Sequence, residues 1–401
     1  MVLTDGIQSK LRSTIVGMVV FAVALPSMCL ADGLLAITGA TIETATDAGA
    51  IENGTILIRD GKIEAVGTDV SVPGSAAVIR AGGKTIMPGI VDPYYVVSVP
   101  SSSSGAAPRV IVFQGRTFVI GGSPAATDSS FIKVADAFQP ARWDWRPAVR
   151  SGITTTHLIT RGFGQSCLAS PRMKAAEVQL EVKSPRTFIA VSNEPKSLKV
   201  LRSGLKKPSS SSSSRSGSRS PTSASPSSSS STTTPPIWDD VRSGKQPLLV
   251  NANNAAAVLY VVKELEKEEN KDVKVAVLVS GADALLTLEQ LPTERLTLVL
   301  APRIETEPTT RRLVNVAKEA VDLGIPVAFS LSSNQSNFRS SQDSPLFAVA
   351  QLVHLGLDRE TAIRSLTRAP AELLGLEETF GTIEEGRQAN LLVFDGDPLS
   401  A

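Results

Sequence analysis

The chain has 401 residues, of which 42% are hydrophobic and 20% are charged, so it is long and apolar enough to bury a large core. Its 40 basic residues nearly balance 39 acidic ones, and we therefore expect no nucleic-acid partner and no attraction to an anionic membrane. The two cysteines cannot supply a disulfide framework or a cysteine-based zinc site, and histidine is equally scarce, with two residues in the chain.

The first segment, residues 1–31, is predicted to be an export signal peptide. A basic start precedes residues 15–25 (IVGMVVFAVAL), and small residues at Cys29 and Ala31 suit cleavage before residue 32. The apolar run is shorter than the roughly 20 residues that span a bilayer. We therefore expect a periplasmic or extracellular protein with no stable membrane span after cleavage. An uncleaved anchor and a lipoprotein attached through Cys29 are the alternatives.

Residues 34–86 are predicted to form short β-strands. Within them, residues 54–66 (GTILIRDGKIEAV) place isoleucines in alternation with other side chains, as in a half-buried strand. Asp60-Gly61 supplies the positive φ angles that a tight two-residue turn requires. This segment is therefore predicted to be a β-hairpin.

Beyond this β region, apolar runs typical of strands alternate with amphipathic stretches typical of helices. The strand-like runs are residues 153–160, 187–192, 247–251, 273–280, 296–301 and 326–332, and the helical stretches include 255–268 and 309–323. Such alternation predicts a parallel sheet. The pattern alone leaves open whether that sheet is open or closed into a barrel.

Residues 208–236 interrupt the alternation with a serine- and proline-rich stretch. It has no apolar residue larger than alanine or proline, so it cannot offset the entropy lost on ordering. We predict a disordered insertion, with a binding or glycan-bearing role as the alternative. After it, helices are expected at residues 344–355 and 358–365, with Asp358 as the cap of the second, and a strand near the end.

Two pairs of segments at opposite ends of the chain resemble the opening and closing signatures of the amidohydrolase superfamily, especially its imidazolonepropionase-like branch. The opening pair is residues 53–67 (NGTILIRDGKIEAVG) and 83–92 (GKTIMPGIVD). The closing pair is residues 362–375 (AIRSLTRAPAELLG) and 381–398 (GTIEEGRQANLLVFDGDP). Each signature is moderately specific, and their order at opposite ends strengthens the resemblance.

The resemblance implies an α/β fold made of two parts. A distorted TIM-like (β/α)8 barrel would comprise residues 87–375. A small β-sandwich would combine residues 34–86 with residues 376–401, so that both chain ends meet in one domain.

The resemblance also implies metal-dependent hydrolysis, but several residues of this chain differ from the metal ligands of the family. Family members typically hydrolyse C–N bonds with zinc or another divalent ion held by histidine and carboxylate side chains. In the family the Pro-Gly-x-x-Asp signature, here residues 88–92, runs into His-x-His. Tyr94 and Val96 hold those two histidine positions in this chain. Valine has no donor atom, and tyrosine binds well only as phenolate, which is costly near neutral pH.

The later family positions depart in the same way. The strands that carry further histidines in the family here end in Asn251 and Ser280, and Ser332 stands at the place of the catalytic aspartate. The remaining candidates, His157 and His354, cannot restore the lost ligands. Both are expected to be hydrogen-bonded structural residues, although His157 has a pocket role as its alternative.

Asp92 and Cys167, the only cysteine left after signal cleavage, are also expected to be structural. The sequence therefore favours an exported, non-catalytic member with no metal cofactor that acts in binding or as a partner subunit. Its candidate pocket consists of the former family positions Tyr94, Val96, Asn251, Ser280 and Ser332, for an unidentified small molecule or partner protein. The alternative is a hydrolase of non-peptide C–N bonds with an altered site. No nucleophile elbow, phosphate loop or dinucleotide motif supports another enzyme class.

Overall fold

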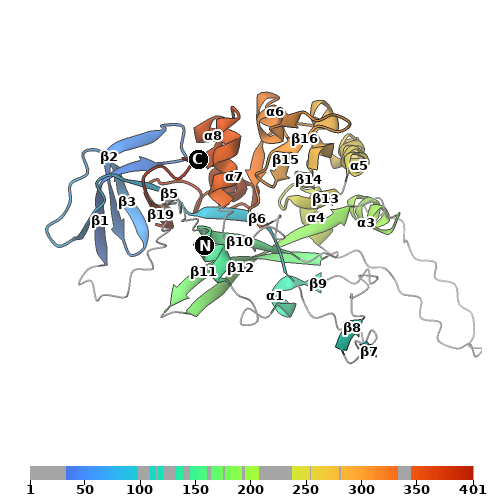
Figure 1. Ribbon diagram of the computed structural model, residues 1–401, viewed down its shortest axis with the longest axis horizontal. Helices are drawn as coiled ribbons and strands as arrows, with labels where there is room; N and C mark the ends of the chain where they lie inside the picture. Colours follow the sequence, from blue (N-terminus) through green and yellow to red (C-terminus); the bar gives the residue numbers. More distant parts are fainter. Residues whose placement is uncertain are drawn as a thin grey trace, which may run out of the picture.

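The computed structural model describes residues 33–97, 109–113, 116–120, 132–138, 145–159, 164–174, 177–191, 195–206, 237–252, 254–279, 281–332 and 345–400. The predicted signal peptide (1–31) and insertion (208–236) lie outside these ranges and stay predictions. Figure 1 shows a small β region to one side of a larger α/β region, with the C-terminal end of the chain beside the small one.

The small β region is one six-stranded sheet to which both ends of the chain contribute. Its order is β19 (Leu391–Asp395), β5 (Lys84–Pro88), β1 (Leu34–Glu43), β2 (Ala50–Arg59) and β3 (Lys62–Gly67), with β4 (Ala77–Arg80) against β1. β19 pairs antiparallel with β5, so the closing segment joins the opening one. The predicted hairpin is confirmed, because β2 and β3 pair antiparallel around Asp60 (φ 50°) and Gly61 (φ 79°).

Both faces of this sheet are covered by apolar side chains. Successive residues of a strand point to opposite faces. Accordingly, Leu35 and Ile37 of β1 pack in one buried cluster, while Leu34 and Ala36 pack in another. The region therefore has two small cores of its own, one on each side of β1.

The larger region is built on a nine-stranded sheet. Its order is β18 (Val327–Phe329), β15 (Leu296–Leu300), β14 (Val275–Val279), β13 (Leu248–Ala252), β12 (Glu177–Val191), β11 (Gly164–Lys174), β10 (Ile153–Ile159) and β6 (Ile90–Val96), and β9 (Ile132–Lys133) pairs with β11. Each strand-like run found in the sequence overlaps one of these strands, although β12 begins ten residues before the run 187–192 and β18 ends three residues before the end of the run 326–332. Two further ladders are small: β7 (Arg109–Phe113) with β8 (Arg116–Ile120), and β16 (Glu305–Thr306) with β17 (Leu313–Val314).

One strand departs from the expected (β/α)8 pattern. β6 is parallel to β10, and the strands from β12 to β18 are parallel to one another. β11, however, runs antiparallel to both β10 and β12, so a hairpin replaces one strand–helix step. The ladders begin at β6 and end at β18, and no backbone ladder joins these two strands within the described residues. The fold is TIM-barrel-like, with a separate β domain and without a continuous ring of ladders.

Helices alternate with the parallel strands. They are α1 (Val134–Ala137), α2 (Arg146–Arg150), α3 (Pro195–Leu205), α4 (Ile237–Arg242), α5 (Ala255–Leu265), α6 (Val316–Asp322), α7 (Pro345–His354), α8 (Arg359–Leu366) and α9 (Arg368–Leu373). Short 3-10 helices lie at η2 (Glu268–Asn270), η3 (Gly281–Leu286) and η4 (Leu288–Gln290). No helix in the described part of the chain is long and apolar enough to cross a membrane.

The single helix predicted over residues 309–323 was wrong in its first half. Thr309 has a φ of 65°, and β17 follows it, so the helix α6 begins only at Val316. The side chain of Asn315 accepts a hydrogen bond from the backbone N–H of Lys318 at 3.1 Å and caps this start. Amphipathic spacing identified the buried face of α6, but the asparagine cap sets its boundary.

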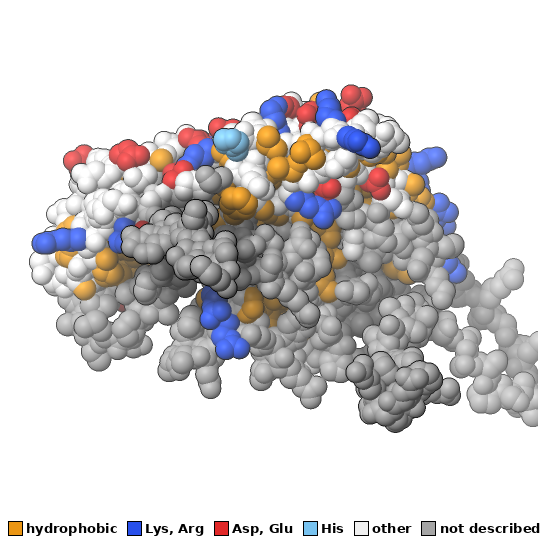
Figure 2. Space-filling model, viewed as in Figure 1, with side chains coloured by type: hydrophobic (Ala, Val, Ile, Leu, Met, Phe, Trp, Pro, Cys, Tyr) orange, Lys and Arg blue, Asp and Glu red, His pale blue; other side chains and the backbone are white. Residues whose placement is uncertain are grey.

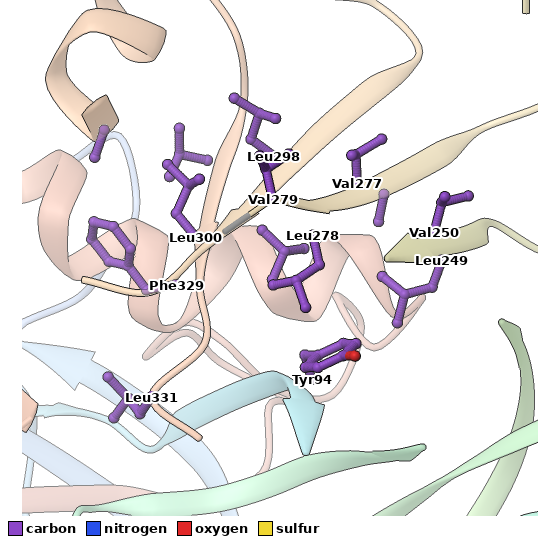
Figure 3. Packing of buried hydrophobic residues seen from close by; sticks show 14 of the residues in the cluster. Tyr94, Leu249, Val250, Val277, Leu278, Val279, Leu298, Leu300, Phe329 and Leu331 are labelled. Carbon is purple, nitrogen blue, oxygen red and sulfur yellow. The ribbon is translucent and has the colours of Figure 1, made fainter. Parts of the chain in front are cut away.

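The main hydrophobic core lies among the parallel strands (Figure 3). Leu249 of β13, Leu278 of β14 and Leu300 of β15 belong to one buried cluster with Phe329 of β18. Figure 3 shows the ring of Tyr94, from β6, directed toward Leu249 and Leu278. Tyr94, a predicted pocket residue, therefore lies inside the apolar core rather than on the outer surface.

Charged side chains of both signs are interspersed on the face seen in Figure 2. Among the described residues of that face, no large patch of a single sign is visible. This distribution agrees with the near balance of charge in the sequence.

The Pro-Gly step of the opening signature has a packing reason. Gly89 lies between β5 and β6, and a Cβ atom there would come within 2.3 Å of the Oγ1 atom of Thr154 in β10. Its backbone N–H donates to the carbonyl of Asn390 at 2.7 Å, just before β19. Gly89 therefore lets the opening strands approach both β10 and the closing segment.

We expect Asp358→Ala to lower the free energy of unfolding by about 1 kcal/mol, because this residue is the N-cap of α8. Its Oδ2 atom accepts hydrogen bonds from the backbone N–H of Thr361 at 2.8 Å and from its hydroxyl at 2.9 Å. Urea denaturation of the two proteins measures the loss. Asp358→Asn, which keeps a capping oxygen, is the control and should retain most of the stability.

Candidate functional site

The former family positions gather where the first and last strands of the main sheet meet. Asp92, at the end of the opening signature, lies on β6, while Ser330 and Ser332 directly follow β18. The hydroxyl of Ser330 donates to Oδ1 of Asp92 at 2.9 Å, and the backbone N–H of Ser332 donates to Oδ2 at 2.9 Å. Residues almost 240 positions apart are thus joined through one carboxyl group.

Tyr94 takes part in the same arrangement through its backbone. Its N–H donates to Oδ1 of Asp92 at 3.0 Å, and its carbonyl accepts from the hydroxyls of Ser330 at 3.1 Å and Ser332 at 2.7 Å. We call these four residues (Asp92, Tyr94, Ser330 and Ser332) the seam network. All four are buried.

The electrostatic environment of Asp92 is set by burial. The side chain is fully buried, and the cost of charging a carboxyl group away from water raises its pKa above the ordinary value. Hydrogen bonds from Ser332, Tyr94 and Ser330 act in the opposite direction, because they favour the carboxylate. Burial outweighs them, so the pKa of Asp92 stays raised.

A raised pKa gives a defined pH dependence of stability. Asp92 contributes stability that is fully present below its unfolded-state pKa, at about 4, and is lost as the pH rises through its folded-state pKa. We expect the free energy of unfolding of the wild type, measured relative to Asp92→Asn, to fall as the pH rises from about 4 toward neutrality. Urea titrations of both proteins at several pH values test this. A difference that rises with pH would contradict the expected sign.

The side chain of Tyr94 connects the seam network to the neighbouring parallel strands. The amide Nδ2 atom of Asn251, at the end of β13, donates a hydrogen bond to the Tyr94 hydroxyl at 2.8 Å. The structure therefore brings three predicted site residues together, namely Tyr94, Asn251 and Ser332. Val96 lies two residues further along β6, half-buried against the core. Ser280 lies outside the described residues, so its position stays a prediction.

His157 is held in a buried position by hydrogen bonds. Its Nδ1 atom lies 3.0 Å from the carbonyl of Pro93, and its Nε2 atom lies 2.5 Å from the hydroxyl of Ser166. Since a carbonyl only accepts, Nδ1 donates, and in the neutral ring Nε2 accepts from the serine. His157 pairs in register with Leu168, which packs with Ala371 of α9. It therefore has the environment of a structural histidine.

The remaining sequence candidates lie apart from the site. Cys167 is buried on β11, and burial raises the pKa of its thiol to about 12. Such a thiol is almost entirely protonated at neutral pH and is a poor nucleophile. His354, the last residue of α7, is exposed. Neither residue adds chemistry to the seam network.

Ser330 is the site residue that the sequence analysis missed. It lies two positions before Ser332, so strand periodicity places both on one side of the chain. The position of Ser330 on the same side of the chain as Ser332 could have identified it as a site residue. This reasoning applies only after Ser332 has been assigned to the end of the strand.

Comparison with known proteins gives matches along most of the chain. The model of the Amidohydrolase family matches residues 255–401. The imidazolonepropionase of Geobacillus sp. (strain WCH70) is 24% identical over 372 residues, which cover 86% of this chain and 84% of that protein. The imidazolonepropionase of Geobacillus kaustophilus (strain HTA426) is 23% identical over 393 residues, covering 88% and 86% respectively.

The fold is similar to that of a solved structure. An amidohydrolase from Thermotoga maritima MSB8 has a TM-score of 0.64 and 19% identity, covering 91% of this chain and 95% of that one. Together, the family model and the imidazolonepropionase relatives support a member of the amidohydrolase superfamily. The two sequence signatures of the superfamily are also in contact, because Val91 of the opening one packs with Ala371 and Leu374 of the closing one.

The residues at the superfamily's metal-binding positions do not fit a divalent metal ion. Val96 offers no donor atom, the Tyr94 hydroxyl accepts from Asn251, and Ser332 donates its hydroxyl to a backbone carbonyl. The one carboxyl group, Asp92, already accepts three hydrogen bonds. Zinc requires about four nitrogen, sulfur or anionic oxygen donors. Across the described ranges, no three His, Cys, Asp or Glu side chains converge on a point.

Proposed function

We propose that this protein is a non-hydrolytic member of the amidohydrolase superfamily that acts by binding a small molecule or a partner protein. The observation that carries the proposal is the donor chemistry at the superfamily's ligand positions. A phenol hydroxyl, an isopropyl group, a carboxamide and a hydroxymethyl group stand at Tyr94, Val96, Asn251 and Ser332. None of them is an anionic or imidazole donor at neutral pH.

The proposal is tested by metal content and turnover of the purified mature protein. We expect far less than one zinc, manganese or iron per chain by elemental analysis. We also expect no hydrolysis of imidazolone propionate, the substrate in the name of the curated relatives, with an active imidazolonepropionase as positive control. Stoichiometric metal, or turnover abolished by a chelator, would overturn the proposal. Turnover that a chelator leaves intact would instead favour a hydrolase with an altered site.

The proposed binding group is the Tyr94–Asn251 pair. Asn251 is half-buried, and its amide offers a further N–H and a carbonyl oxygen beyond the hydrogen bond to Tyr94. Neutral donors and acceptors of this kind suit a polar, uncharged group on a ligand. Native mass spectrometry of protein purified from its source measures retained small molecules. We expect Asn251→Leu to lose such a ligand and Gln290→Leu, a surface amide on the same chain, to keep it; equal retention would reject this site.

We further propose that the protein is exported. A basic start, the apolar run of residues 15–25 and small residues at Cys29 and Ala31 support cleavage before residue 32. Cell fractionation followed by N-terminal sequencing tests the proposal. A mature protein that starts near residue 32 and leaves the cytoplasm is expected, whereas a full-length cytoplasmic chain would reject it.

A further inference from the structure

We propose that the seam network is a metal-independent lock that holds together the first and last strands of the main sheet. It consists of residues that the superfamily uses differently or leaves unassigned, and it converts the former catalytic position into a structural one. The proposal concerns conformation and does not depend on whether the protein turns over a substrate.

The first step is the gap in backbone pairing. Every other neighbouring pair of strands from β6 to β18 is joined by a ladder of backbone hydrogen bonds. β6 and β18 are in contact, and the hydrogen bonds described between β6 and the residues that follow β18 are those of the seam network. Within the described residues, the two edges of this curved sheet are therefore joined at this point by the hydrogen bonds of the seam network and not by a ladder of backbone hydrogen bonds.

The second step is the hydrogen-bond accounting at the seam. Asp92 accepts from the backbone N–H groups of Tyr94 and Ser332, one from each strand segment. The Ser332 hydroxyl donates to the Tyr94 carbonyl, so the two segments are also bonded in the reverse direction. Each serine hydroxyl has one proton, and Ser330 therefore donates either to Asp92 or to the same carbonyl. Buried polar groups on both edges are satisfied only while the edges stay together.

The third step is the protection of the seam from water. α8 and α9 both contact β6 and β18, so these two helices cover the outer side of the seam. Val91, on the opposite face of β6 from Asp92, packs against Ala371 and Leu374. With water excluded, loss of one hydroxyl leaves its partner unsatisfied rather than hydrated.

Hydrogen–deuterium exchange tests the lock because it reports local opening. We expect Ser330→Ala and Ser332→Ala each to speed exchange about tenfold in peptides covering residues 90–96 and 327–332, and the double variant to speed it by up to about a hundredfold. Peptides covering β13 and β14 should change much less. Addition of a chelator should leave every rate unchanged, because no ion takes part.

Ser170→Ala is the matched control. Its hydroxyl is buried on β11 of the same sheet and has no hydrogen-bond partner among the described residues, so its removal should not open the seam. Acceleration by the same factor in all peptides would show a general loss of stability and overturn the proposal. So would rates in the two seam variants that match those of Ser170→Ala, or seam exchange that a chelator accelerates.

Discussion

Replacing Asp92 by alanine is expected to lower the free energy of unfolding by about 3 kcal/mol or more. The change leaves two buried backbone N–H groups, of Tyr94 and Ser332, without their acceptor, whereas the Ser330 hydroxyl can still donate to the Tyr94 carbonyl. Each buried donor left unsatisfied costs about 1–3 kcal/mol. Removal of a costly buried carboxyl group offsets part of that sum, as its raised pKa indicates. Urea denaturation followed by circular dichroism measures the net loss.

Asp322→Ala is the control for the loss of a carboxyl group as such. Asp322 is about half exposed and pairs with Lys318 one helical turn away. Exposed pairs at this spacing contribute about 0.3–0.5 kcal/mol, so the control should be almost neutral. If Asp92→Ala lost no more stability than Asp322→Ala, the donors around Asp92 would have to find other partners, and the seam network would not be structural.

The fold could be predicted largely from local patterns and from the resemblance. The isoleucine alternation and Asp60-Gly61 fixed the hairpin, because a two-residue turn with positive φ leaves few other structures. The parallel strands were visible as short apolar runs, since strands buried on both faces have no polar alternation. Asp358 was found as a cap because its place follows from local sequence alone.

The remaining features depend on contacts between distant segments. The hairpin that makes β11 antiparallel was missed, because its pairing follows from tertiary contacts and the segment gives no clear turn signal. The hydrogen bond from Asn251 to Tyr94 joins residues 157 positions apart, and those between β6 and the end of β18 span more than 230. Local sequence patterns do not predict that residues so far apart in the chain are in contact. The resemblance placed them at one site but assigned them metal chemistry rather than hydrogen bonding.

The seam network also explains how the buried carboxyl group of Asp92 is accommodated beside Tyr94 and Val96. A buried carboxyl group without partners would be strongly destabilising. Here the serines that follow β18 and the backbone of Tyr94 supply the partners. Ser332, placed where relatives are expected to carry an aspartate, donates to a carbonyl that an aspartate could not bond as carboxylate. The substitutions at the site are therefore mutually consistent as a hydrogen-bonded set.

That consistency predicts that the superfamily's aspartate cannot simply be restored. We expect Ser332→Asp to lower the free energy of unfolding by about 3–5 kcal/mol at neutral pH. The new carboxylate would lie next to Asp92 and the Tyr94 carbonyl, in a position that is 2% exposed, and no cation is among the hydrogen-bond partners of Ser332 in the described part of the chain. Two buried like charges destabilise each other, so at least one carboxyl group must take up a proton.

Ser332→Asn distinguishes the effect of charge from the effect of side-chain size, because asparagine has nearly the same shape as aspartate but carries no charge. Urea denaturation should show a smaller loss for Ser332→Asn, and the difference between the two variants should shrink as the pH falls and the carboxyl groups become protonated. Zinc should not restore Ser332→Asp, since the neighbouring ligand positions still hold Tyr94 and Val96. Stabilisation of that variant by micromolar zinc would mean that one carboxylate completes a metal site here, and the donor-chemistry argument would then fail.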